Sequence, residues 1–272
     1  FGSSDVLQVD ERVNTMGSTS CQCQKPRPSG LESSLPAEMV TWNVRGRAAP
    51  CRMICAYANF KVKETHYAWD KAENFILQED PSMNLPILLD DKGQVQCRSN
   101  AVLFHLAQIF GMNGVDADQQ TQIEMLLFDC NDLRNLFMDQ TMWTRKVTQT
   151  VKEFEAKCKG DGYWVAANSF FNKQDKWLHL HGCDFFVADI PKACDFCIWE
   201  MLDVHEAFAA DCGKPSPLYR RPHLNSFFHR FRDLSKLQEY FASAAYRLPT
   251  LIPRFTFWSG CGSKPAADAP RG

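Results

Sequence analysis

The arrangement of apolar residues changes once along the 272-residue chain, near residues 112–116, and this change most constrains the fold. Before it, short runs with strand-like alternation exchange with runs of helical periodicity. The predicted order is strand, helix, strand, helix, strand, strand, helix, over residues 39–42, 49–58, 61–67, 71–77, 87–90, 94–97 and 100–110. After it, the pattern is helical from Asp118 to about Tyr246. The sequence therefore predicts an α+β protein of two domains, the second all-α.

Local composition and the same patterns predict the domain boundaries. Residues 1–36 are rich in Ser, Pro, Gly and Gln, so we expect an irregular extension there. The mixed domain is expected over residues 37–112, and the helical domain over 117–250. Residues 158–183 contain large apolar side chains without a clean period and are interpreted as a helix-loop-helix insertion. Residues 251–272 are expected to form a C-terminal tail.

Charge and cysteine content exclude several classes of function. A net charge of -2 and a pI near 6.4 give no general attraction to nucleic acid or to anionic lipid. No apolar run approaches the roughly 18 residues of a membrane-spanning helix, so we expect no membrane span. Twelve cysteines in a chain of this length, with no apolar signal segment, favour free thiols in a reduced compartment.

Two segments with cysteines raise the question of a metal site. Cys194 and Cys197 form a lone C-x-x-C inside a helical pattern, where core packing is favoured and redox or metal use is the alternative. His179, His181 and Cys183 offer three ligands on a short segment without an obvious fourth. Because no second cysteine pair completes a zinc site, we expect no metal.

The first residue is Phe1 rather than Met, which bears on the compartment. We expect a cytoplasmic protein. An organellar location stays open, because an upstream targeting segment can have been removed from such a chain.

Four separated segments carry the information on function. Residues 41–50 read Thr-Trp-Asn-Val-Arg-Gly-Arg-Ala-Ala-Pro, a strand that passes into a helix. Residues 84–87, Asn-Leu-Pro-Ile, put a proline directly before a strand, and residues 97–103, Cys-Arg-Ser-Asn-Ala-Val-Leu, open a helix with a serine. Residues 195–205 read Asp-Phe-Cys-Ile-Trp-Glu-Met-Leu-Asp-Val-His. Together these segments resemble the cytosolic glutathione transferases of the mu and sigma classes, and the resemblance spans about residues 37–258.

The resemblance implies both a fold and a reaction. It implies a thioredoxin-like βαβαββα domain that binds glutathione, followed by an all-helical bundle that contributes the site for a second, hydrophobic substrate. The implied activity is detoxification, by conjugation of the glutathione thiolate to hydrophobic electrophiles. The implied assembly is a homodimer; the alternative is that the chain is a subunit of a larger assembly, which it contacts through its 36-residue head.

Several ligand contacts are implied by the resemblance. Pro86 resembles a cis proline, with Leu85 before it offering its backbone to the cysteinyl part of glutathione and Asn84 beside it. Ser99 is expected to bind the γ-glutamyl carboxylate, since a helix N-terminus is a ready anion site. Arg98 replaces the usual glutamine at this site, where it strengthens carboxylate binding or is simply a surface residue.

Three further contacts are implied at the edges of the glutathione site. Trp42 is expected to touch the glutathione backbone. Trp69 lies near, though not in register with, the tryptophan that grips the glycine end. Asp132 resembles the acidic residue that reaches the γ-glutamyl amine of the ligand in the neighbouring subunit, and a solvated helix surface is the alternative.

Thr41 stands where this family keeps its catalytic tyrosine. A free thiol with a pKa near 8.5 is only slightly ionised at neutral pH, so the thiolate needs a donor or a cation close to the sulfur. Thr41 offers a shorter hydroxyl, and Arg47 offers a positive charge or is a surface salt bridge. Two hypotheses follow: an active glutathione transferase that uses Thr41 and Arg47, or a catalytically weak or inactive transferase-like subunit with a structural or interaction role.

Overall fold

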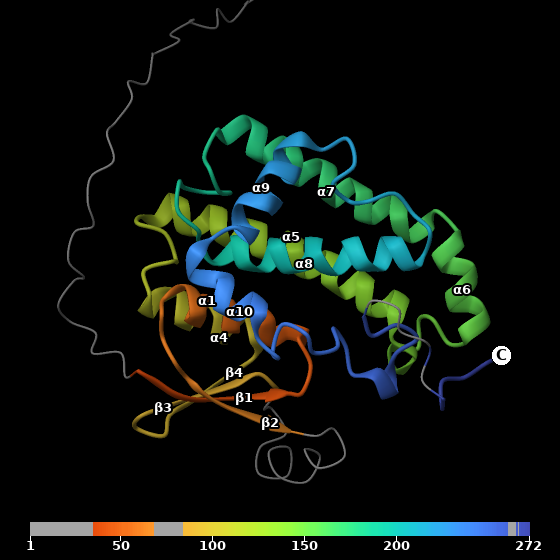
Figure 1. Cartoon of the computed structure of the whole chain (residues 1–272), viewed down its shortest axis with the longest axis horizontal. Coiled ribbons are helices and arrows are strands. Elements are labelled where there is room, and N and C mark those ends of the chain that lie inside the picture. Colours follow the sequence, from red (N-terminus) through yellow and green to blue (C-terminus); the bar gives the residue numbers. More distant parts are fainter. Residues whose placement is uncertain (1–34, 68–83, 261–264, 266) are drawn as a thin grey trace, which may run out of the picture. The chain divides into compact units, whose positions relative to one another are not determined.

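A computed structural model describes residues 35–67, 84–260, 265 and 267–272 of the chain (Figure 1). The described strands are β1 (Pro36–Trp42), β2 (Lys63–Tyr67), β3 (Ile87–Asp90) and β4 (Val95–Cys97). The α-helices are α1 (Ala49–Tyr57), α4 (Ser99–Ile109), α5 (Ala117–Thr141), α6 (Val151–Lys159), α7 (Gly162–His181), α8 (Ala193–Asp211), α9 (Pro222–Arg232) and α10 (Gln238–Ala242). Short 3-10 turns are η1 (Gly46–Ala48), η2 (Trp143–Arg145), η3 (Ser235–Leu237) and η4 (Pro253–Phe255). The helix predicted over residues 71–77 lies outside the described residues.

The four described strands form one mixed sheet in the order β2-β1-β3-β4. β1 and β2 run parallel, with Thr41 opposite His66, while β3 is antiparallel to both β1 and β4. Helices α1 and α4 pack against each other and against α8 of the helical region. The prediction of a thioredoxin-like domain followed by an all-helical domain is therefore confirmed.

Helix α8 is the centre of the helical domain. It packs against α1 and α4 on the side of the sheet and against α5 and α9 among the helices. Its side chains Phe196, Ile198, Trp199, Leu202 and Phe208 are fully buried. Cys194 and Cys197 are also buried within this helix, so packing accounts for the C-x-x-C spacing.

Asp195 caps the start of α8 from its first turn. Lys192 precedes the helix and makes no side-chain capping bond. The buried Asp195 carboxylate instead accepts backbone N–H groups from Lys192 at 2.7 Å and from Phe186 at 2.9 Å. Burial raises the pKa of Asp195 to about 7, although both backbone bonds act to lower it.

The start of α4 differs slightly from the prediction. Ser99 was expected to cap a helix over residues 100–110, but α4 begins at Ser99 and Arg98 precedes it. Arg98 has φ 73° and ψ 119°, a backbone conformation that side-chain-bearing residues rarely adopt. The turn before α4 therefore requires a backbone conformation that arginine does not favour by itself.

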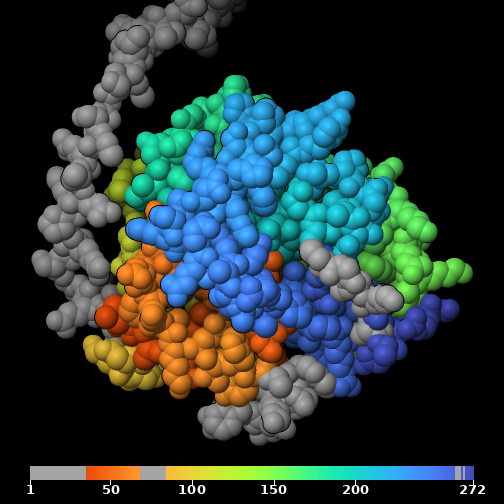
Figure 2. All heavy atoms as spheres, in the orientation of Figure 1, coloured from red at the N-terminus to blue at the C-terminus, as the bar shows by residue number. Residues whose placement is uncertain are grey.

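The C-terminal segment lies on both domains. Pro249 and Thr250 accept backbone hydrogen bonds from Arg45 at 2.8 Å and from Gly46 at 3.0 Å. Further on, Pro270 accepts a bond of 2.7 Å from the first residue of α6, Val151. Figure 2 shows these last residues in dark blue beside the green surface of α6. The segment thus joins the turn after β1 to the helical domain.

Other expectations concern thiols, metals and membranes. The nine cysteines for which the structure gives a state are free. Within the described ranges no group of three or more metal-ligating side chains is found. No helix in the same ranges is long and apolar enough to cross a bilayer.

Candidate functional site

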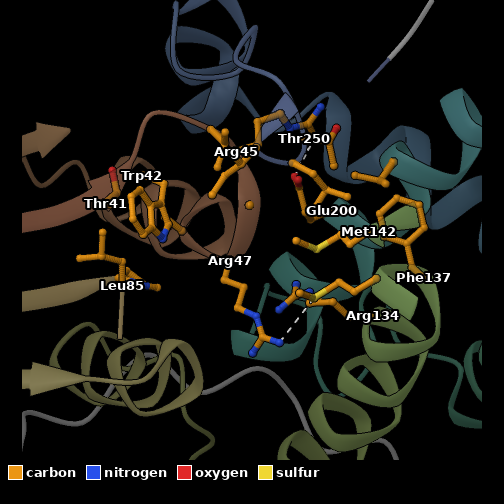
Figure 3. Close-up of a pocket in the computed structure, with 18 of the residues that line it drawn as sticks. Thr41, Trp42, Arg45, Arg47, Leu85, Arg134, Phe137, Met142, Glu200 and Thr250 are labelled. Atoms are coloured by element: carbon orange, nitrogen blue, oxygen red, sulfur yellow. Dashed lines mark hydrogen bonds and ion pairs between the residues drawn. The ribbon is translucent and has the colours of Figure 1, made fainter. Parts of the chain in front are cut away.

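A pocket of about 230 Å³ lies where the turn after β1 meets the helical domain (Figure 3). On the sheet side it is lined by Thr41, Trp42, Leu85 and Pro86, and the turn residues from Val44 to Ala48 complete that wall. The helical and C-terminal lining consists of Arg134, Phe137, Met138, Met142, Glu200, Met201, Val204, Thr250, Leu251 and Ile252. Most of this second wall is apolar, which suits a hydrophobic ligand.

Thr41 lies at the pocket wall, but its hydroxyl is engaged elsewhere. The residue is fully buried, and Oγ1 lies 2.8 Å from Glu64 Oε1 and 3.1 Å from His66 Nδ1. It also accepts a hydrogen bond of 3.0 Å from Nη2 of Arg52. Because the hydroxyl has a single proton, and neighbours on three sides, it is not a free donor for a ligand in the pocket.

The Thr41 cluster, defined as Thr41, Arg52, Glu64 and His66, follows from the fold. The parallel register places His66 opposite Thr41 on the neighbouring strand, with Glu64 two residues earlier on the same face. Arg52 reaches the cluster from α1 and lies within 2.7 Å of Glu64 Oε1 through Nε and Nη2. Its Nη1 donates to the carbonyl of Val44 at 2.9 Å. The charge of this buried arginine is therefore fully partnered.

Arg45 joins the two domains through buried charges. Its Nη2 donates to Glu200 at 2.7 Å and to Asp203 at 2.6 Å, both on α8. The guanidinium also lies 4.6 Å from the ring centre of Tyr246. Burial opposes its charge, but Glu200 and Asp203 hold the pKa of Arg45 above its ordinary value. Arg45 fixes the turn that carries Arg47.

Arg47 extends from that turn toward α5 (Figure 3). Its nearest polar contacts are long, at 3.5 Å to Asn135 Oδ1 and 3.6 Å to Met138 Sδ. Burial lowers the pKa of Arg47, and the nearby charges of Arg134 and Arg145 lower it further. The side chain is thus a half-buried cation at the junction of the two walls.

The remaining predicted site residues differ in where they lie. Trp42, Leu85 and Pro86 line the pocket, and the Leu85–Pro86 bond is cis, as expected from the resemblance. Asn84 is exposed just before them. Trp69 lies outside the described residues.

Arg98, Ser99 and Asp132 do not line the pocket. Ser99 is buried at the N-terminus of α4, with the exposed Arg98 directly before it. Asp132 is exposed on α5.

Sequence reasoning missed the helical wall of the pocket. Its most unusual member is Arg134, which is only 7% exposed. The signal was present, because Cys130, Leu133, Arg134 and Phe137 follow the spacing of one buried helix face. An arginine on such a face marks either a buried ion pair or a ligand contact.

Comparison with known proteins gives a consistent relationship over both domains. The family models "Glutathione S-transferase, N-terminal domain" and "Glutathione S-transferase, C-terminal domain" match residues 37–108 and 131–244. Glutathione S-transferase Mu 1 of Oryctolagus cuniculus is 27% identical over 241 residues, covering 83% of this chain and 100% of the relative. Glutathione S-transferase Mu 2 of Homo sapiens is 26% identical over 234 residues, covering 82% and 99%.

A solved structure agrees with these relatives. The crystal structure of glutathione S-transferase Blo t 8 superimposes with a TM-score of 0.68 at 26% identity, covering 79% of this chain and 97% of that one. Both domains match the models of one family, and the pocket and the cis proline agree with this relationship. The chain therefore belongs to the cytosolic glutathione S-transferase family and is similar to its mu class.

Proposed function

We propose that this protein binds glutathione and transfers it to hydrophobic electrophiles. The observation that carries the proposal is the composition of the pocket, in which Trp42, Leu85 and Pro86 face an apolar wall that includes Phe137 and Met142. One wall supplies the backbone groups expected to hold a peptide, and the other excludes water from an apolar partner. In the reaction the thiolate sulfur bonds to the electrophilic carbon, and the leaving group departs with its electron pair.

The proposed ligand contacts keep the assignments implied by the family. Leu85 offers its backbone to the cysteinyl part, with Asn84 beside it, and Trp42 contacts the glutathione backbone. The α4 N-terminus at Ser99, with Arg98 before it, binds the γ-glutamyl carboxylate through its N–H groups and positive end. Asp132 reaches the γ-glutamyl amine of the ligand bound to a partner subunit, and Trp69 lies near the glycine end.

Arg47 is the group that we assign to thiolate stabilisation. A cation within a half-buried wall lowers the pKa of a nearby thiol, because it favours the ionised form. The sequence offered the Thr41 hydroxyl for the same task. Since that hydroxyl already faces Glu64, His66 and Arg52, we assign Thr41 to positioning the end of β1 instead.

A second candidate function is supported by the Thr41 cluster itself. A buried hydroxyl with three polar neighbours leaves no side-chain donor at the position of the family's tyrosine. A protein built in this way can hold glutathione without activating it. In this alternative the chain is a weak or inactive subunit that acts through its 36-residue head or its C-terminal segment.

Partners and compartment form part of the proposal. The family is typically dimeric, and Met125, Phe128 and Leu136 leave an exposed apolar stripe along α5. We propose a homodimer through this face, and a cytoplasmic location with an organelle as the alternative. Sedimentation of the wild-type protein and of Phe128→Asp tests the dimer, since a charge on the buried stripe of a dimer favours monomers. An unchanged molar mass in the variant would argue against this face.

Titration with glutathione is the main test of the transferase proposal. Thiolate absorbance near 240 nm reports the pKa of the bound thiol, and turnover of 1-chloro-2,4-dinitrobenzene with release of chloride reports the transfer. We expect a thiol pKa below about 8.5, the value of a free thiol. Arg47→Gln should raise this pKa toward the free value and lower turnover. Tight binding with an unshifted thiol pKa and no turnover would overturn the transferase proposal and support the second candidate function, a weak or inactive subunit.

A further inference from the structure

The positively charged side chains that line the pocket outnumber the negatively charged ones. They are Arg45, Arg47, Arg134 and Glu200. Arg45 and Glu200 form a salt bridge of 2.7 Å, and Asp203 gives Arg45 a second carboxylate. In the described part of the chain, neither Arg47 nor Arg134 has a salt bridge with a carboxylate. Two guanidinium groups are therefore left over on the walls of one cavity.

Arg134 is the more deeply buried of the two. Its side chain lies near the Cys197 thiol, and Nη2 has no hydrogen-bond partner among the described residues. Burial opposes its charge, although Cys197, Cys130 and Glu200 raise its pKa above the ordinary value. Both thiols are neutral near pH 7, because burial raises their own pKa, that of Cys197 to about 11. Glu200 then remains, and it is already paired with Arg45.

Arg47 approaches Arg134 from the opposite wall. It projects from the turn after β1 toward α5, the helix that carries Arg134 (Figure 3). Its contacts with Asn135 and Met138 are too long to compensate a full charge. The two like charges are close enough to act on each other. A buried cation without a counter-ion is unfavourable, and an anion placed between the two would relieve both.

The apolar surroundings define what kind of anion fits. Phe137, Met138 and Met142 lie on the same helix as Arg134 or directly after it, and Met201 and Val204 face them from α8. An inorganic anion would leave these walls uncovered. An organic molecule with an apolar body and one acidic group would cover the walls and pair with the guanidinium groups.

We propose that Arg134, on the helical side of the pocket, together with Arg47 on the turn facing it, selects a second substrate or ligand that has an apolar body and a carboxylate or sulfonate group. This inference rests on the proposed function, because it assigns the opposite wall to glutathione. Arg134 is a specificity residue in this scheme. A bidentate guanidinium contact to the acid group distinguishes it from a neutral molecule of the same shape.

Two dyes with the same apolar body provide the test. 8-Anilinonaphthalene-1-sulfonate carries the acid group, and N-phenyl-1-naphthylamine lacks it. Fluorescence titrations of the full chain are made with saturating S-methylglutathione, which fills the glutathione wall without a thiolate. We expect the sulfonate to bind about tenfold more tightly than the neutral dye, as one charge-assisted pair would give.

Variants assign this preference to the pocket. Arg134→Met should lower the affinity for the sulfonate about tenfold and change that for the neutral dye less than about twofold, because the lost contact is ionic. Arg47→Met, in which the side chain is half-buried, provides a second variant if the first does not fold. Arg230→Gln, on the surface of α9 near Asp184, is the matched control and should change neither affinity.

The outcomes separate this inference from the proposed function. Equal affinities for the two dyes, or a preference that survives both pocket variants, would overturn the inference while glutathione binding stands. A sulfonate preference that disappears when S-methylglutathione is present would assign the arginine pair to the glutathione moiety and also overturn it. Failure to bind glutathione, with the dye preference retained, would count against the proposed function alone.

Discussion

Two buried arginines on opposite sides of the turn after β1 differ in their hydrogen-bond and ion-pair partners. Arg52, in the Thr41 cluster, has a carboxylate, a hydroxyl and two carbonyls around its guanidinium. Arg134, on the far wall of the pocket, is about as deeply buried but keeps an unpartnered Nη2. A satisfied buried charge stabilises the native arrangement and has nothing left to offer a ligand. A buried guanidinium without a carboxylate partner is unfavourable until an anion binds, so the presence of that partner separates structural from ligand-binding arginines.

The largest expected effect on stability comes from removing Glu64, the carboxylate partner of Arg52. In Glu64→Leu the buried guanidinium would keep only the hydroxyl and the carbonyls, so we expect a loss of about 3 kcal/mol in the free energy of unfolding. Urea denaturation measures it. The double variant Glu64→Leu/Arg52→Met should recover most of the loss, since it removes the charge together with its partner. A single variant as stable as the wild type would show that the cluster does not stabilise the fold.

Asp195 is a third buried ionisable group, and it differs from both arginines because its partners are backbone N–H groups. Asp195→Asn can accept only one of the bonds from Lys192 and Phe186, so we expect a loss of about 2 kcal/mol. Urea denaturation at a fixed pH measures this loss. An Asn variant with the stability of the wild type would mean that one of the two bonds is dispensable.

The same residue predicts a pH dependence. Burial raises the pKa of Asp195 from 3.8 to about 7, so between these values the folded state holds a proton that the unfolded chain has released. The free energy of unfolding should therefore fall as the pH rises from about 4 to about 7. Denaturation at several pH values measures this slope, which should be smaller in Asp195→Asn. Equal slopes in the two proteins would assign the pH dependence to other groups.

Removal of the Thr41 hydroxyl tests how much its hydrogen bonds stabilise the Thr41 cluster. Thr41→Val keeps the shape of the buried side chain but leaves Arg52 and Glu64 each short of one hydrogen bond. We expect a loss of about 1 kcal/mol in the free energy of unfolding. The pKa of the bound glutathione thiol should stay at its wild-type value, because the hydroxyl faces the cluster. A rise in that pKa would show that the Thr41 hydroxyl does stabilise the thiolate.

Much of this organisation is visible in the sequence, and the part that is not has a physical reason. The β1-to-α1 turn, the proline before β3 and the serine at the start of α4 are local patterns, and the structure places them as expected, apart from a one-residue shift in the start of α4. The partners of Thr41 are not local, since Glu64 and His66 reach it only through the parallel pairing of β1 with β2. The sequence therefore predicted that Thr41 is a key position but not which partners its hydroxyl contacts.

Arg134 illustrates the same limit from the helical side. Its place on the buried face of α5 follows from spacing, but its lack of a carboxylate partner depends on how α5 packs against α8 and on the Arg45–Glu200 pair. Periodicity reports which face of a helix is buried. It does not report what lies across from that face, and that is what turns a buried arginine into a binding group.

Substitution of Arg134, which lacks a carboxylate partner, should have an effect of the opposite sign. Arg134→Met replaces a buried cation by an apolar side chain of similar length, next to Phe137 and Met138. Because no carboxylate partner is lost, we expect the free energy of unfolding to rise by about 1 kcal/mol in the absence of ligand. Urea denaturation of the ligand-free protein beside Arg52→Met makes the contrast direct, since Arg52→Met strands the Glu64 carboxylate and should destabilise. If both substitutions destabilise equally, Arg134 is as well partnered as Arg52, and the distinction between the two sides of the turn fails.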